Sequence, residues 1–136
     1  MMPVALEIVS PTRLLLSRPV DMVVVPAAEG ELGVLPGHAP MIVLLRGGLV
    51  RIFEAGKETS RLFVGSGFAE ITPERCTVLA NEAIPLAEVS KREAADRLKV
   101  AESVYEAVDK NDVAAREAAQ EQLYSARVMG DLAQAP

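Results

Sequence analysis

The sequence has one histidine, one cysteine and no run of apolar residues long enough to cross a membrane as a helix. The longest apolar runs, MVVV at 22–25 and MIVLL at 41–45, fall well short of the ~20 residues that a spanning helix requires. The single cysteine, Cys76, excludes an internal disulfide, and we interpret it as a small buried residue of a strand. The first residues show neither a secretory signal nor an Arg/Ser-rich leader, which predicts a bacterial cytoplasmic protein.

The sequence also lacks any concentration of positive charge. Its 136 residues include 14 Lys and Arg against 19 Asp and Glu, and the net charge is −5 with no basic run. Nucleic-acid binding requires a concentrated positive surface, so no nucleic-acid partner is expected. Attraction of a polybasic segment to anionic lipid is excluded for the same reason. Any membrane contact is therefore predicted to run through a protein partner.

Catalytic and metal-binding patterns are missing as well. A zinc site needs three or four His, Cys or carboxylate ligands, and the sequence contains no HxH, HxxxH or CxxC. It also contains no GxSxG and no phosphate-binding GK[ST] motif. A general base needs a second positioned group, so we interpret His38 as a loop imidazole bonded to nearby backbone or as an interface residue. The sequence thus predicts no catalytic residue, no metal site and no cofactor.

Glycine and proline divide the chain, because eight of the nine glycines and eight of the nine prolines precede residue 86. We therefore predict two domains, residues 1–85 and 86–136. The first contains short apolar or alternating runs at 4–9, 20–25, 41–46, 49–53, 60–65, 68–72 and 76–80. Short strands with glycine turns between them predict an antiparallel β-sandwich or flattened barrel. In LVRIF, Leu49, Arg51 and Phe53 are expected to share one face.

The second domain has a helical pattern. Ser90 and Glu93 fit a capping box, and a second helix is expected to begin near Asp112. Glu93/Arg97 and Glu106/Lys110 have the spacing of helical ion pairs. Small and apolar side chains recur at spacings of three and four, which predicts an antiparallel hairpin with a seam of Leu98, Ala101, Tyr105, Ala115, Ala119, Leu123 and Ala126. Alanine buries little apolar area, so we expect a weakly docked, mobile hairpin, or else one that simply covers a sheet face.

The segment EGELGVLPGHAP, residues 29–40, concentrates turn residues. Gly30, Gly33 and Gly37 permit positive φ, while Pro36 and Pro40 stiffen the backbone. A rigid acidic loop without catalytic company suits recognition of a protein partner. The candidate partner-contact residues are Glu29, Gly30, Glu31, Leu32, Gly33, Pro36, Gly37 and His38.

This segment, followed by FVGSGFAEITPERCTVLANEA and an Ala-rich helical hairpin, resembles the epsilon subunit of the bacterial F-type ATP synthase over nearly the whole chain. The resemblance implies a non-catalytic rotor subunit of the central stalk, whose sandwich binds the gamma subunit and rests on the polar loops of the c-ring. It places Glu31 in direct contact with the ring. It also implies a peripheral position on the cytoplasmic face of the inner membrane, with membrane contact only through the c-ring.

The family's hairpin folds onto the sandwich or extends along gamma into the alpha/beta catalytic head, where it blocks ATP hydrolysis. Some members bind ATP through a motif in which an acid and an arginine would stand at Ser90 and Glu93, so no ATP binding is expected here. Residues 112–136 hold two arginines against four acids, a net charge of −2, which predicts weak inhibition. Two alternatives remain open, a β-sandwich interaction module unrelated to ATP synthase and a metal-free jelly-roll enzyme.

Overall fold

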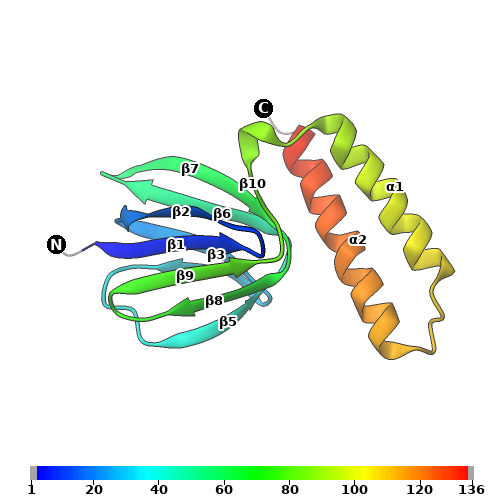
Figure 1. Cartoon of the computed structure of the whole chain (residues 1–136), viewed down its shortest axis with the longest axis horizontal. Coiled ribbons are helices and arrows are strands. Elements are labelled where there is room, and N and C mark those ends of the chain that lie inside the picture. The colour runs from blue at the N-terminus through cyan, green and yellow to red at the C-terminus, as the bar shows by residue number, and fades with distance from the viewer. Residues whose placement is uncertain (1–2, 135–136) are drawn as a thin grey trace.

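The computed structural model describes residues 3–134, in which a ten-stranded β-sandwich is followed by two helices at one end of it (Figure 1). The strands are β1 (Val4–Ser10), β2 (Arg13–Val20), β3 (Met22–Ala27), β4 (Gly30–Val34), β5 (Met41–Leu45), β6 (Gly48–Glu54), β7 (Lys57–Val64), β8 (Gly67–Ile71), β9 (Arg75–Ala80) and β10 (Ala83–Pro85). A 3-10 turn, η1 (Leu86–Glu88), leads to α1 (Lys91–Ala107) and α2 (Val113–Gln134). The predicted class, a β-sandwich followed by a helical hairpin, is confirmed.

The strands form one folded sheet in the order β10-β7-β6-β3-β5-β8-β9-β1-β2, with β4 attached to β3. Among residues 3–134, neighbouring strands pair antiparallel except β1 and β9, which are parallel. The core between the two layers is built from alternate strand residues, such as the fully buried Leu6 and Ile8. In β6, Val50 and Ile52 are buried while Arg51 lies on the outer face, as the alternation predicted.

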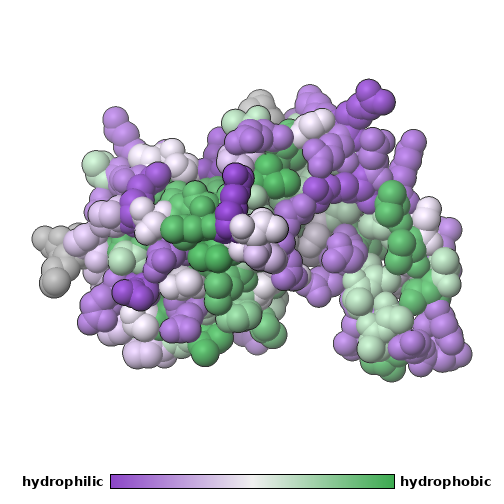
Figure 2. Space-filling model, in the orientation of Figure 1, coloured by the Kyte–Doolittle hydropathy of each residue, from purple (hydrophilic) through white to green (hydrophobic). Residues whose placement is uncertain are grey.

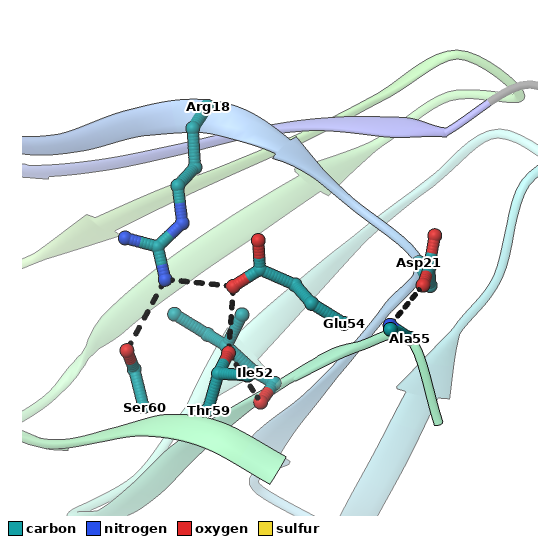
Figure 3. A network of polar contacts seen from close by, with 7 residues as sticks. All are labelled: Arg18, Asp21, Ile52, Glu54, Ala55, Thr59 and Ser60. Atoms are coloured by element: carbon teal, nitrogen blue, oxygen red, sulfur yellow. Dashed lines mark hydrogen bonds and ion pairs between the residues drawn. The ribbon is translucent and has the colours of Figure 1, made fainter. Parts of the chain in front are cut away.

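A polar network joins β2, at one end of the strand order, to β6 and β7 (Figure 3). Arg18 of β2 donates to Glu54 Oε1 of β6 at 2.9 Å and to Ser60 Oγ of β7 at 3.1 Å. The Thr59 hydroxyl donates to the same Glu54 oxygen at 2.6 Å. Thr59 and Arg18 together lower the pKa of the Glu54 carboxyl, because both interactions favour its ionised form. Side chains thus connect β2 to two strands, β6 and β7, that are not neighbours of β2 in the strand order.

The predicted run at 20–25 is in fact two strands. Val20 ends β2, and a bend at Asp21 reverses the chain before β3 begins. Asp21 Oδ2 accepts the Ala55 amide at 2.6 Å (Figure 3). Ala55 and Gly56 form the β6–β7 turn with φ of 53° and 77°, the positive values that a tight two-residue hairpin needs. An acceptor from the β2–β3 bend thus holds the non-glycine residue in its unusual backbone conformation.

Three strands are not predicted by the sequence. In β2 (RLLLSRPV), apolar and polar residues do not alternate cleanly, and β4 (GELGV) is rich in glycine. β10 (AIP) has three residues and ends in proline. Each is stabilised by a neighbour that has a clear strand pattern: β1 for β2, β3 for β4 and β7 for β10. Hydrogen bonding to these neighbours therefore outweighs the weak intrinsic preference of the three segments for strand conformation.

Both predicted helix starts are confirmed. The Ser90 hydroxyl accepts the Glu93 amide at 3.2 Å, and Asp112 Oδ1 accepts the Ala115 amide at 3.1 Å. The Glu93 carboxylate, however, pairs with Arg97 at 3.0 Å, as its spacing predicted, so the capping box shows only its serine half. The Glu106/Lys110 spacing does not act as a helical pair, because α1 ends at Ala107.

The hairpin has two apolar clusters with different roles. Ala101, Leu123 and Ala126 are buried together between the helices, with Leu98 and Tyr105 packed against them. Ala119 is also buried, and Ala115 is half-buried. The second cluster joins the hairpin to the sandwich and was not predicted; it contains Phe63, Ala94 and Met129, with Ile84, Val89, Val128, Leu132 and Ala133 around them. The seam residues were also expected to dock the hairpin on the sandwich, and that expectation is wrong: the seam holds the helices to each other, while another set of residues contacts the sandwich.

Candidate partner-contact surfaces

Residues 29–38 do not form one projecting loop. Gly30–Val34 is strand β4, which is hydrogen-bonded to β3 alone among the strands of residues 3–134 and is therefore a sheet edge. Its glycines differ from expectation, since Gly30 and Gly37 have φ of 135° and 82° but Gly33 lies in the strand without a positive φ. The single-loop interpretation is wrong, because β3 supplies main-chain partners that a Gly-rich sequence does not reveal.

The two ends of β4 lie at opposite ends of the sandwich. The turn before it is near α2, because Gly30 and Glu31 line one cavity together with Tyr124 of α2. The turn after it is at the far end, where the Gly37 amide donates to the Pro73 carbonyl at 2.8 Å. Five strand residues span about 16 Å at ~3.3 Å each. Glu31 and the segment from Pro36 to His38 therefore lie at separate places on the molecule.

Glu31 and His38 have different surroundings. The Glu31 carboxylate is 62% exposed and lies 3.8 Å from the Arg51 guanidinium. Arg51 is held more closely by Glu58 at 3.2 Å, and Glu58, followed by Glu31, raises the pKa of Arg51. His38 Nδ1 lies 2.8 Å from the Ala39 carbonyl oxygen, which is the backbone bond expected of a structural loop imidazole. Glu31 is thus the more accessible of the two.

The unpaired edge of β4 carries free main-chain groups. The Pro26 carbonyl accepts the Arg46 amide at 3.0 Å, so Pro26 directs its main-chain groups away from β4. Glu31, its register partner, is then at a non-hydrogen-bonded position of the β3–β4 pair. The N–H and C=O of Glu31, and by alternation those of Gly33, therefore point outward from the sheet edge. A partner can bind them without disturbing the sandwich.

A second exposed surface is a row of apolar side chains outside the sandwich, part of the green area on its visible face (Figure 2). The strand register joins Leu44 to Phe68, Phe68 to Leu79, Leu79 to Val9 and Val9 to Leu14. Leu44 is 70% exposed, Phe68 42% and Leu14 54%. Register partners share a face of the sheet, so these five residues form a continuous strip that we call the apolar row. Exposed apolar strips of this kind mark protein contacts.

The remaining reactive groups are few. Cys76 is buried, and burial raises the pKa of its thiol to about 11, so its interpretation as a buried strand residue is confirmed. Within residues 3–134, His, Cys, Asp and Glu form no group of three that could hold a metal. In the same range, no helix has both the length and the apolar character needed to span a membrane.

The sandwich matches a known family. Residues 3–86 fit the model described as ATP synthase, Delta/Epsilon chain, beta-sandwich domain. A Granulibacter bethesdensis protein named ATP synthase epsilon chain is 63% identical over 129 residues, which are 95% of this chain and 96% of that relative. The chain belongs to the ATP synthase delta/epsilon family. The resemblance seen in the sequence is thereby confirmed.

A second relative and a solved structure agree with this assignment in sequence and in fold, respectively. The Gluconacetobacter diazotrophicus epsilon chain is 42% identical over 136 residues, covering 100% of this chain and 96% of that one. A chain of the Euglena gracilis mitochondrial ATP synthase has the same fold, with a TM-score of 0.76 at 23% identity over 96% of this chain and 81% of that one. Family membership makes the chain a non-catalytic subunit, so the unrelated module and the jelly-roll enzyme are no longer needed as explanations.

Proposed function

We propose that this epsilon-type chain is a rotor subunit in the central stalk of a bacterial F-type ATP synthase. It joins the gamma subunit to the c-ring on the cytoplasmic face of the inner membrane and touches the membrane only through that ring. The observation that carries the proposal is the apolar row, because five aligned apolar side chains on the outside of a sandwich require a protein to cover them. A firmly held rotor subunit needs such a surface.

Gamma is the partner assigned to the apolar row. The next register row of the same face places Glu70 beside Ile42 and Thr77, and Glu7 beside Thr77. A complementary partner surface would thus present apolar side chains in the centre and basic groups at one side. The continuity and apolar character of this strip suit a contact that persists during rotation.

The c-ring is assigned to the β3–β4 turn and the β4 edge. This surface is acidic at Glu29 and Glu31 and offers the outward main-chain groups of Glu31 and Gly33, which suit polar loops better than an apolar partner. Because β4 is anchored to β3 along its length, the contact has a rigid support. The segment from Pro36 to His38 lies at the other end of the sandwich and belongs to a separate contact.

The hairpin is assigned a weak regulatory role: it leaves the sandwich and extends along gamma toward the alpha/beta head. Its charge supports weak rather than strong inhibition, as argued from residues 112–136. Its few contacts with the sandwich support reversible docking. Both features agree with a hairpin that moves but binds an acidic head poorly.

Isothermal titration calorimetry with ATP is expected to show no binding tighter than millimolar. The Ser90 hydroxyl already accepts the Glu93 amide, and the Glu93 carboxylate is paired with Arg97. Neither residue offers the acid and arginine that the family's nucleotide motif would place there. A dissociation constant well below millimolar would contradict this proposal.

Co-purification with gamma and the c-ring tests the proposed division of labour. A chain ending at Pro85 is expected to retain both partners, because the main core of the sandwich contains no hairpin residue. Glu31→Lys is expected to weaken ring capture roughly tenfold and to leave gamma binding unchanged. Glu102→Lys, the same charge change on an exposed position of α1, serves as the control. Loss of gamma from the truncated chain, or unchanged ring capture by Glu31→Lys, would contradict the assignment.

A further inference from the structure

The contacts between hairpin and sandwich gather near the start of α1 and the end of α2, around Phe63, Ala94 and Met129. Beyond that cluster the two parts separate around a cavity of about 580 Å³, whose lining includes Phe63, Arg97, Val100 and Met129. An interface with such a space inside it makes fewer apolar contacts than a packed core. Each remaining contact therefore has a large influence on whether the hairpin docks.

Ser125 of α2 approaches the sandwich closely at Gly47, in the turn between β5 and β6. A Cβ placed on Gly47 would lie 2.8 Å from both Cα and Cβ of Ser125, and nearer still to its Oγ. Real Cβ atoms essentially never approach other atoms within 3.0 Å. Gly47 does not have a left-handed φ, and the three atoms nearest to the added Cβ all belong to Ser125, so α2 supplies the obstacle to alanine. The need for glycine here belongs to the docked state.

Other contacts near this point are too weak to offset a clash. The Arg46 guanidinium lies over the Tyr124 ring at 5.0 Å from its centre. Arg97 of α1 is paired with Glu82 of the sandwich, and both side chains are about one-third exposed. Partly exposed ion pairs and cation–π contacts stabilise a structure modestly. Moving α2 to relieve a clash would also lengthen the contact between Arg46 and Tyr124.

We propose that Gly47 and Ser125 form a steric latch, so that α2 docks because residue 47 has no side chain. This inference rests on the proposed function, in which the hairpin leaves the sandwich. It adds the position that sets the equilibrium between the docked and undocked hairpin, which is the β5–β6 turn where Gly47 leaves room for the α2 backbone at Ser125. Any side chain at residue 47 shifts the hairpin toward the undocked state without altering the sandwich.

A cysteine placed at Met129 measures the undocked fraction, because that side chain is 2% exposed at the interface. Its rate of reaction with DTNB is proportional to undocking, while Cys76 stays buried in the sandwich core. In the Met129→Cys background, Gly47→Ala is expected to raise the rate at least about tenfold, given the usual cost of overpacking. Gly65→Ala is the control, because its Cβ would meet its nearest neighbour at 3.7 Å.

A second variant tests the steric cause. Ser125→Gly removes two of the three atoms that the alanine methyl would meet. Gly47→Ala should therefore raise the DTNB rate less when it is added to Ser125→Gly than when it is added to the parent chain. Equal DTNB rates for Gly47→Ala and the parent chain would overturn the latch. Capture of gamma by the same variants is measured in parallel. If the DTNB rates are equal but the variants still bind gamma, the latch is wrong and the proposed function is unaffected. If the parent chain does not bind gamma, the proposed function is wrong whatever the DTNB rates are.

Discussion

Replacing Leu44 with aspartate is expected to weaken gamma binding by at least about a hundredfold, or ~2.7 kcal/mol. Leu44 is 70% exposed at one end of the apolar row, so the free chain accepts a carboxylate there at little cost. In the complex the same carboxylate would be buried against an apolar surface without a partner. Burial of an unpaired charge is among the most costly changes to an interface. The measurement is the dissociation constant for purified gamma by titration calorimetry.

The control for this variant is Val113→Asp. Val113 is 54% exposed, but it is the first residue of α2 and lies outside the apolar row. An acid in the first turn of a helix is tolerated or slightly favourable. While the hairpin is docked on the sandwich, the gamma affinity of this variant should match that of the unmodified chain. If Leu44→Asp binds gamma as tightly as Val113→Asp, gamma does not cover the row.

Much of the fold could be predicted because its patterns are local. The alternation in β6 and the caps at Ser90 and Asp112 need no knowledge of distant residues, and all three are present. The family resemblance could also be recognised from the sequence, because it rests on long contiguous motifs. What the sequence could not reveal depends on neighbours in space. β4 reads as a glycine loop, yet β3 turns it into a sheet edge with Glu31 and His38 near opposite ends of the sandwich.

The contact surfaces show the same limit. The apolar row was missed because Leu44 stands in an entirely apolar run and Phe68 shares its face of β8 with the polar Glu70. Only the register shows that they align across five strands. The residues that dock the hairpin on the sandwich were missed for a related reason. Helical periodicity identifies only the faces that the two helices turn to each other. It does not identify Met129, whose partner Phe63 is far away in the sequence.

Gly67→Ala is expected to cost more than about 3 kcal/mol of folding stability, because it combines backbone strain with a clash against main chain. Gly67 begins β8 with a φ of 157°, which residues with side chains rarely adopt. An added Cβ would lie 2.8 Å from Ala80 Cα and closer still to the Leu79 carbonyl oxygen. These atoms belong to β9, so relief requires β8 and β9 to move apart in the centre of the sheet.

Urea unfolding measures this effect, and Gly33→Ala is its matched control. Gly33 is also a strand glycine, but its φ is not positive and an added Cβ would meet only the Met22 sulfur at 4.0 Å. Alanine there should leave the urea midpoint unchanged or raise it slightly, because it reduces the entropy of the unfolded chain. Equal midpoints for the two variants would contradict the close approach at Gly67. If instead Gly67→Ala alone lowers the midpoint, β8 and β9 pack too closely for any side chain at that position.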